Sequence, residues 1–205
     1  FMTDATSAAG GIDFEASNTD VYYFAPQKNF ASDGGLWLAL MSEKAIERAA
    51  KIAATDRYIP EFLSLQIAID NSRLNQTLNT PAISTLFLLN EQIKWINASG
   101  GLKWADAKTK ASSKLLYDWA DSASFASAFV SDPKHRSQVV VTIDFDESID
   151  AAEIAKVLRA NGVVDVDPYR KLGRNQLRVA TFTSTEQADI EALIACIDYV
   201  VAELG

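Results

Sequence analysis

The sequence has a single cysteine and no long apolar run, and each scarcity excludes a class of protein. One cysteine, Cys196, cannot form an intrachain disulfide, which fits a reducing cytoplasm. It lies in an apolar helical stretch, so we expect a small buried residue of the core and not a reactive thiol. No apolar run approaches the roughly 20 residues of a membrane helix, because Trp37–Met41 and Thr85–Leu89 soon meet polar residues. We therefore expect a soluble protein.

Basic charge is also in short supply, since the net charge is −8. A general attraction to nucleic acid or anionic lipid is disfavoured by this balance, so any anion site must be local. No secretory signal segment opens the chain, and we expect a cytoplasmic location.

Two residue types that often carry function are interpreted as structural. The only histidine, His135, has no second histidine with which to bind a metal and no nucleophile motif around it. The four tryptophans stand at apolar positions and are expected in the core: Trp37, Trp95, Trp104 and Trp119.

Turn residues and apolar periodicity divide the 205 residues into three regions. In residues 1–75, the short runs Val21–Phe24 and Leu36–Met41 predict strands. A helix is expected over Ser42–Ala54, with Ser42 as its N-cap. Strands joined by loops and helices favour an α/β layer.

The middle region should consist of two long helices. Thr80 and Pro81 are typical of an N-cap and a first helical position, and the helix should run to about Asn97. The glycine pair Gly100–Gly101 then separates it from a second helix that ends near residue 121. We expect these helices to connect two domains.

The last region, from about residue 123, has a β-α-β-α rhythm. Strands are predicted over Gln138–Phe145 and Gln176–Phe182. Asp150–Glu153 is a capping box that opens a helix ending at Asn161, and Ser184–Gln187 opens a final amphipathic helix. Its inner side comprises Ile190, Leu193, Ile194, Ile197, Val200 and Val201. This pattern predicts a small α+β domain with helices on one face of a sheet.

The strongest local signal is Lys28 within the sequence Tyr23–Phe30, before the glycine pair Gly34–Gly35. A lysine that follows an apolar strand stands at the strand end where α/β enzymes place their sites. From spacing alone, an ordinary solvent-exposed loop lysine is the alternative.

A second signal is Asp4, 24 residues before Lys28. A carboxylate at one strand end and a lysine at the next can face each other across a pocket. Pyridoxal-phosphate chemistry gives that pairing a reason, because the lysine binds the aldehyde and the carboxylate keeps the pyridine nitrogen protonated. The alternative is that Asp4 only caps a turn.

A third signal is a cluster of four cations in an acidic protein: Arg170, Lys171, Arg174 and Arg178. Arginine side chains suit carboxylate and phosphate groups because they bind both oxygens at once. The alternative is a solvated turn whose charges pair with Asp165 and Asp167.

Three stretches together resemble the phosphoserine aminotransferases, especially the actinobacterial form: Asp4–Gly35, Asn75–Pro81 and Pro168–Val179. The resemblance runs through practically the whole chain. It implies the α/β architecture of fold-type I pyridoxal-phosphate transferases, with residues 1–98 as the C-terminal remainder of the large cofactor domain and 99–205 as the small α+β domain. It also implies a homodimer whose interface holds both sites.

The resemblance assigns roles to the residues that match the family's motifs. Lys28 would form the Schiff base with pyridoxal 5'-phosphate and move the substrate proton, and Asp4 would pair with the pyridine nitrogen. Gln27 would bind the cofactor phosphate, which Asn79 and Thr80 would reach from the partner subunit.

For the substrate, the resemblance implies that Arg178 binds the α-carboxylate, while Arg170 and Arg174 help to bind the phosphate. The sequence departs from the family here, because Tyr169-Arg170 stands where a His-Arg pair is usual. The implied reaction transfers an amino group from glutamate to 3-phosphohydroxypyruvate, giving phosphoserine and 2-oxoglutarate in serine biosynthesis.

Family members are considerably longer, and the part preceding Asp4 normally supplies a phosphate-binding turn and an aromatic ring that stacks on the cofactor. We expect the chain to be a C-terminal portion that is inactive alone. Two other interpretations stay open. One is another fold-type I aminotransferase for an anionic substrate without phosphate, and the other is a non-catalytic ligand-binding or dimerisation module.

Overall fold

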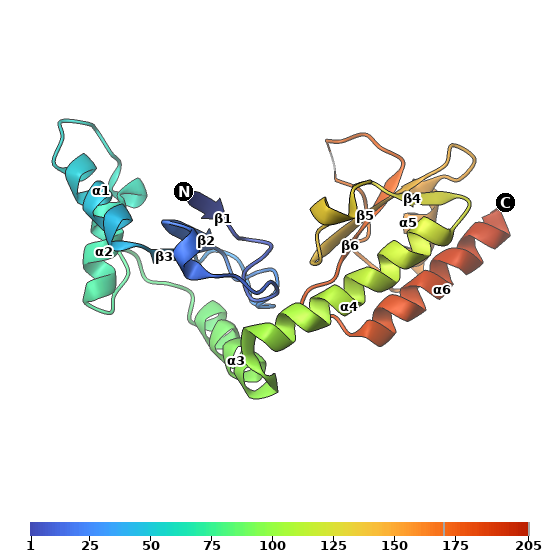
Figure 1. The fold of residues 1–205 in the computed structure, drawn as a ribbon, viewed down its shortest axis with the longest axis horizontal. Coiled ribbons are helices and arrows are strands. Elements are labelled where there is room, and N and C mark those ends of the chain that lie inside the picture. The colour runs from blue at the N-terminus through green and yellow to red at the C-terminus, as the bar shows by residue number, and fades with distance from the viewer. Residues whose placement is uncertain (170, 205) are drawn as a thin grey trace. The chain divides into compact units, whose positions relative to one another are not determined.

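The chain folds into two compact units, each described by itself. The computed structural model describes residues 1–169 and 171–204, and the side chains of 1–169 and 171–203. The first unit comprises Phe1–Ala9 and Phe14–Trp95, and the second comprises Gly10–Asp13 with the described residues from Ile96 on. Figure 1 shows the order of the elements along the chain.

A three-stranded sheet organises the first unit. β1 (Met2–Asp4) runs parallel to β2 (Val21–Phe24), and β3 (Leu38–Met41) pairs antiparallel with the other side of β2. The aromatic ring of Tyr22 is buried against Ala5 and Ala9, and Phe14 stacks on it with ring centroids 3.8 Å apart. Both predicted strands are confirmed, the second starting two residues later than expected.

Three helices follow this sheet: α1 (Glu43–Ala53), α2 (Leu65–Arg73) and α3 (Ile83–Ser99). The Ser42 hydroxyl accepts a hydrogen bond from the backbone N–H of Ala45, as predicted for an N-cap. Short 3-10 helices occupy Ala16–Asn18 and Glu61–Leu63. The predicted helix start at Pro81, with Thr80 as N-cap, is wrong by two residues, because α3 begins at Ile83.

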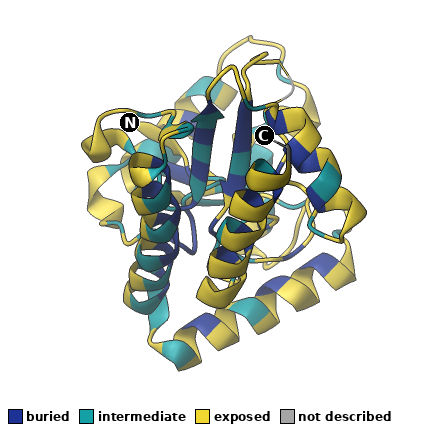
Figure 2. Ribbon diagram, turned by 90° about the vertical axis from the view of Figure 1, so that its right-hand side faces the viewer, coloured by how far each residue is buried: buried dark blue, intermediate teal, exposed yellow. Residues whose placement is uncertain are grey.

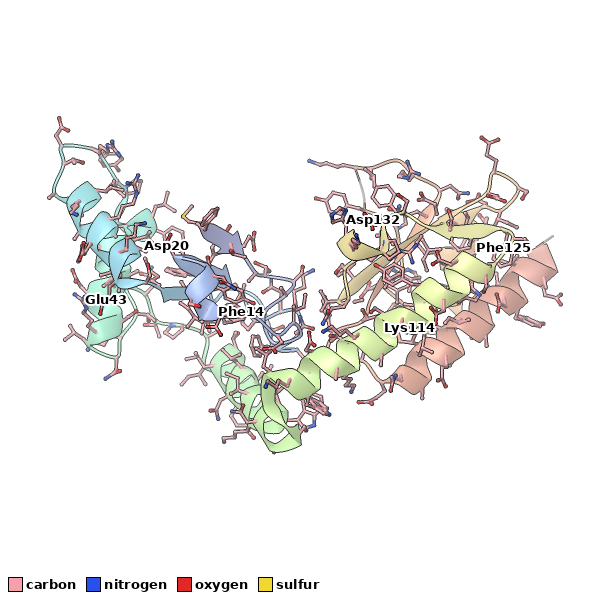
Figure 3. All side chains as sticks on the ribbon, in the orientation of Figure 1. Phe14, Asp20, Glu43, Lys114, Phe125 and Asp132 are labelled. Atoms are coloured by element: carbon pink, nitrogen blue, oxygen red, sulfur yellow. The ribbon has the colours of Figure 1, made fainter. Side chains whose placement is uncertain are left out.

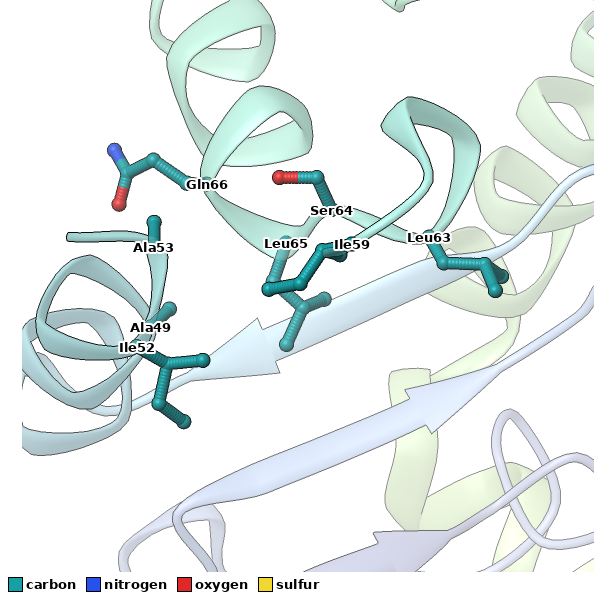
Figure 4. Close-up of a pocket in the computed structure, with 8 residues that line it drawn as sticks. All are labelled: Ala49, Ile52, Ala53, Ile59, Leu63, Ser64, Leu65 and Gln66. Carbon is teal, nitrogen blue, oxygen red and sulfur yellow. The ribbon is translucent and has the colours of Figure 1, made fainter. Parts of the chain in front are cut away.

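A small cavity of about 120 Å³ lies between α1 and α2 (Figure 4). Its walls are mainly apolar, with Ile52 from α1, Ile59 from the segment that leads into α2 and Leu65 from α2 itself. No charged side chain lines it, so it offers no group for acid–base chemistry or for binding an anion.

The second unit is a sheet covered by helices on one face. β4 (Ala126–Ala128), β5 (Val140–Phe145) and β6 (Gln176–Ala180) form an antiparallel sheet in that order. The helices α4 (Gly101–Ser122), α5 (Ala151–Ala160) and α6 (Gln187–Leu204) share one apolar core with it, and a 3-10 helix spans Pro133–His135.

Alternation along β5 explains why one face of the sheet is covered. Val141, Ile143 and Phe145 are buried, whereas the residues between them are only partly buried (Figure 2). The predicted small α+β arrangement matches this unit, including the inward stripe of α6. Asp150 caps α5 through the N–H of Ala152, but Glu153 pairs with Lys156 and does not close the capping box.

Burial was predicted incorrectly at three residues. Cys196 is exposed, because it lies on α6 outside the stripe that contains Ile197. Trp37 is 51% exposed and Trp95 is 36% exposed, so an apolar spacing did not place either in a core. Trp119 is partly buried against the core and donates a hydrogen bond to Asp198.

Among the described residues, no helix is long and apolar enough to cross a membrane. The described part of the chain also holds no group of three or more histidine, cysteine or acidic side chains that could bind a metal ion. His135 is exposed beside Asp132.

The loop Gly10–Asp13 is held in the second unit by buried hydrogen bonds. The Thr109 hydroxyl donates to the carbonyl oxygen of Gly11 over 2.7 Å, and the Thr183 hydroxyl donates to that of Gly10 over 2.8 Å. Gln138 Nε2 reaches the Gly11 carbonyl and Asp106 Oδ1, which also accepts from the N–H of Asp13. The carbonyls of Gly10 and Gly11 are therefore satisfied by side-chain donors.

We predict that Thr109→Val lowers the free energy of unfolding by about 1 kcal/mol, because the Gly11 carbonyl loses its buried 2.7 Å hydrogen bond and keeps only the 3.1 Å bond from Gln138. Ser112→Ala is the matched control. Both side chains lie on α4 and are 0% exposed, but Ser112 Oγ has no hydrogen-bond partner among the described residues. Chemical denaturation of the two variants should show a loss for Thr109→Val only, and equal losses would contradict the assignment.

Candidate active site

Asp4 is the last residue of β1 and its carboxylate is fixed by a local turn. Oδ1 accepts hydrogen bonds from the Thr6 hydroxyl over 2.7 Å and from the Thr6 N–H over 3.0 Å. These bonds favour the charged form, and with a smaller contribution from Tyr23 they lower the pKa of Asp4. Asp4 is exposed, so it is an ionised carboxylate open to a partner.

Lys28 lies in a compact turn immediately beyond β2. The N–H of Ala31 donates to the carbonyl of Lys28, and the N–H of Ser32 donates to that of Pro26. Ala31 adopts a φ of 46°, a left-handed conformation that is uncommon for alanine. The ring of Phe30 stacks against Phe24 at the end of the strand, with centroids 5.4 Å apart. The lysine therefore stands on a fixed turn, where it is half-buried.

Parallel pairing brings Asp4 and the Lys28 turn to one edge of the sheet. Asp4 pairs with Tyr23 in the register of β1 and β2, and the chain ends of both strands point the same way. Asn29 ties the two segments together, because its side-chain Nδ2 donates to the carbonyl of Ser7 over 2.6 Å. The predicted placement of a carboxylate and a lysine at neighbouring strand ends is therefore found.

The other residues expected to bind the cofactor lie on exposed segments. Gln27 precedes Lys28 in the same turn. Asn79 and Thr80 lie between α2 and α3, where the Thr77 hydroxyl donates to the carbonyl of Asn79 over 2.6 Å. Their roles stay predictions.

Arg174 is engaged by an acidic neighbour in the second unit. Its guanidinium binds both oxygens of the Asp144 carboxylate, with Nε 3.1 Å from Oδ1, and lies 4.9 Å from the ring of Phe129. Asp144 raises the pKa of Arg174. The pairing that we considered for the cluster, with Asp165 and Asp167, is not found for Arg174, because both of these carboxylates pair with Arg159.

Arg178 differs from Arg174 because no carboxylate among the described residues forms an ion pair with it. It lies on β6 opposite Thr142, half-buried, with its guanidinium carbon 5.7 Å from the ring of Tyr169. It forms no ion pair with any described residue. Arg170 lies outside the described residues. Figure 3 shows the side chains of both units.

Sequence reasoning missed the two side chains that hold the Lys28 turn, Asn29 and Ser32. The sequence pattern assigns no role to Asn29, but its side chain is 0% exposed. The Ser32 hydroxyl donates to the carbonyl of Thr85 in the first turn of α3 over 2.8 Å. Thr6 is a third residue that was missed, and here the sequence did contain a signal. A threonine two residues after an aspartate is typical of a turn in which the aspartate side chain accepts hydrogen bonds, as Asp4 does from Thr6.

The chain belongs to the class-V aminotransferase family, whose family model matches residues 1–166. Within this family it is 63% identical over 203 residues to a putative phosphoserine aminotransferase of Mycolicibacterium vanbaalenii, which covers 99% of this chain and 55% of that protein. It is 60% identical to a phosphoserine aminotransferase of Rhodococcus opacus, with 98% and 54% covered. The chain thus spans about half the length of the curated relatives it matches, and the predicted resemblance is confirmed.

Solved structures share the fold at lower identity. A phosphoserine aminotransferase from Cytophaga hutchinsonii matches with a TM-score of 0.86 and 22% identity, over 96% of this chain and 54% of that one. An alanine–glyoxylate aminotransferase from Nostoc matches with a TM-score of 0.82 and 17% identity, over 97% and 53%. The predicted α/β fold class of fold-type I transferases is confirmed. Because these structures have different activities, the fold alone does not select a substrate.

We predict that Thr6→Val raises the pKa of Asp4 towards that of an ordinary aspartate, because the Thr6 hydroxyl contributes most to its lowering. A lowered pKa in the folded state stabilises the fold at pH values above the unfolded pKa, and this contribution is lost as pH falls through the folded pKa. Carboxyl-carbon NMR of the Asp4 side chain measures the change. Thr3→Val is the control, because the Thr3 hydroxyl bonds to that of Thr19 and does not contribute to the lowered pKa of Asp4. An unchanged Asp4 pKa in Thr6→Val contradicts the prediction.

Proposed function

We propose that the protein that carries this chain is a phosphoserine aminotransferase, a pyridoxal-phosphate enzyme of serine biosynthesis that acts in the cytoplasm. Its reaction transfers the amino group of glutamate to 3-phosphohydroxypyruvate. The observation that carries the proposal is the pairing of an ionised carboxylate, Asp4, with the Lys28 turn at one sheet edge. The 60–63% identity to proteins of that name supports the substrate.

The donor set at this edge fits pyridoxal phosphate. When bound, the cofactor supplies an aldehyde for the amino group and a ring that withdraws electrons from the substrate α-carbon. An acceptor that stays ionised suits a protonated pyridine nitrogen, and the lowered pKa of Asp4 keeps it in that form. A primary amine suits the aldehyde, and Lys28 provides it.

Lys28 has two tasks in this proposal. Its amine would hold the cofactor covalently, and the same side chain would move the proton at the substrate α-carbon. Gln27 would hold the cofactor phosphate. Asn79 and Thr80 reach the phosphate bound in the partner subunit, so the protein acts as a homodimer.

Arginine side chains bind the anionic substrates. Arg178 binds the α-carboxylate. Its guanidinium lies beside the Tyr169 ring, and no carboxylate among the described residues competes for its N–H groups. Arg170 and Arg174 bind the substrate phosphate. The support for Arg174 is weaker, because Asp144 already neutralises its charge. In this proposal residues 1–98 belong to the large cofactor domain and 99–205 form the small domain.

The pairing of Arg174 with Asp144 favours one alternative. This alternative is an aminotransferase whose anionic substrate has no phosphate. Such a substrate carries less negative charge, so it needs fewer cations from the basic cluster that contains Arg174. Structural neighbours include an aspartate aminotransferase from Thermus thermophilus and the alanine–glyoxylate enzyme of Nostoc. The two candidates differ in whether phosphoserine is accepted as an amino donor.

We predict that Lys28 carries the cofactor. Borohydride reduction of the gene's full-length product with pyridoxal phosphate, followed by peptide mapping, should place the label on Lys28. Lys28→Ala should lose both the label and the visible absorbance band, because no other amine occupies this turn. Lys51→Ala is the control, since this exposed lysine on α1 pairs only with Glu47 among the described residues. A label elsewhere in the wild-type protein refutes the assignment.

We predict that phosphoserine, and not alanine, abolishes the visible absorbance band of the bound cofactor in a single half-reaction.

We further predict that Arg178→Ala raises the phosphoserine concentration needed for this change by roughly 10- to 100-fold, the loss expected for hydrogen bonds to a charged group. Arg174→Ala should have a smaller effect, because Asp144 competes for its guanidinium. A preference for alanine would support the alternative aminotransferase, and equal effects of the two variants would contradict the assignment of Arg178.

A further inference from the structure

Asn29 occupies an unusual position for a polar residue. It directly follows Lys28, and its side chain is fully buried. The amide Nδ2 donates to the backbone carbonyl of Ser7 over 2.6 Å, across 22 residues of sequence. A buried amide is costly unless it is hydrogen-bonded, so this side chain has one strongly preferred orientation.

The bond joins the two segments that carry the proposed cofactor contacts. From Lys28 the connection runs through the adjacent Asn29 to the carbonyl of Ser7, and from the neighbouring Thr6 to the carboxylate of Asp4. Every step is either a covalent bond along the chain or a short hydrogen bond. The pairing of β1 with β2 fixes the strand ends, and the Asn29 bond is the side-chain link that further ties the Lys28 turn to the segment of Asp4.

A second buried hydrogen bond fixes the same turn in another direction. The Ser32 hydroxyl donates to the carbonyl of Thr85, which ties the end of the turn to α3. Both donors are short polar side chains with little exposure, and both donate to a backbone carbonyl. Only the bond from Asn29 leads to the segment of Asp4, which makes Ser32 a matched comparison.

We propose that Asn29 is a positioning residue that sets the placement of the Lys28 amine relative to the Asp4 carboxylate. The inference rests on the proposed function, because it takes these two groups to hold one cofactor. A lysine that must reach the cofactor and then the substrate α-carbon requires a fixed base, and small displacements of reacting groups reduce rates strongly. Asn29 itself touches no reacting atom in this scheme.

The test uses the full-length gene product with Asn29→Asp, Asn29→Ser and Ser32→Ala. Asn29→Asp keeps the side-chain volume but replaces the amide donor by a carboxyl group whose charge can itself move the pH midpoint. The midpoint is therefore judged in Asn29→Ser, a neutral change whose hydroxyl is too short to reach Ser7. Two quantities are measured: the rate at which borohydride-trapped pyridoxal phosphate appears on Lys28, and the pH midpoint of the cofactor absorbance. Hydrogen exchange of the cofactor-free proteins reports whether each variant is folded.

We expect both Asn29 variants to slow trapping about tenfold, and Asn29→Ser to shift the pH midpoint by about half a unit or more. Ser32→Ala should loosen the turn in hydrogen exchange but leave the pH midpoint near that of the wild type. Equal shifts in Ser32→Ala would overturn the proposal, because the effect would then be general loosening. Folded Asn29 variants with wild-type trapping and midpoint would overturn it as well.

The proposed function and the role of Asn29 fail in different ways. If wild-type protein gives no trapped label on Lys28, the cofactor assignment is wrong whatever the variants do. If wild-type protein is labelled on Lys28 and the Asn29 variants behave identically, only the positioning role is wrong. If Asn29→Asp does not fold, Asn29→Ser decides between these outcomes.

Discussion

The parallel pairing of β1 with β2 is the constraint on which the candidate site depends. In a parallel pair both strands end at the same edge, so the residue that closes β1 and the turn that follows β2 become neighbours. A carboxylate and an amine that are 24 residues apart in the sequence thereby come to one place. The antiparallel addition of β3 leaves this edge arrangement unchanged and covers the other side of β2.

Buried hydrogen bonds from polar side chains hold loops and turns in place where the apolar core is small. The core of the first unit is limited to a few alanines and aromatic rings around Tyr22. The Lys28 turn is held there by the buried side chains of Asn29 and Ser32, each donating to a distant backbone carbonyl. In the second unit, Thr109 and Thr183 hold the loop Gly10–Asp13 in the same way. Such bonds are directional, so they specify position as well as stability.

Much of the secondary structure could be predicted because it depends on the local pattern of apolar and capping residues. The buried hydrogen bonds that hold the turns could not, because their partners lie far away in the sequence. Ser42 and Asp150 correctly predicted the starts of α1 and α5, and the apolar stripe from Ile190 to Val200 correctly predicted the buried face of α6. Nothing near Asn29 indicates Ser7, and nothing near Arg174 indicates Asp144, because these contacts arise only when strands and turns are assembled. Cys196 and Trp37 were misplaced for the related reason that an apolar residue in an apolar stretch can still face outwards.

The acidic balance of the chain shapes how an anion can be bound. With a net charge of −8, binding must depend on single cations that are not already neutralised. Both guanidinium groups lie beside an aromatic ring, which orients an arginine without competing for its N–H groups as a carboxylate does. Arg174 is in addition neutralised by Asp144, whereas Arg178 forms no ion pair with a described residue. The distinction between the two arginines therefore lies in the carboxylate beside one of them and not in their position within the basic cluster, and an arginine that is oriented but not neutralised has the property that a carboxylate-binding side chain needs.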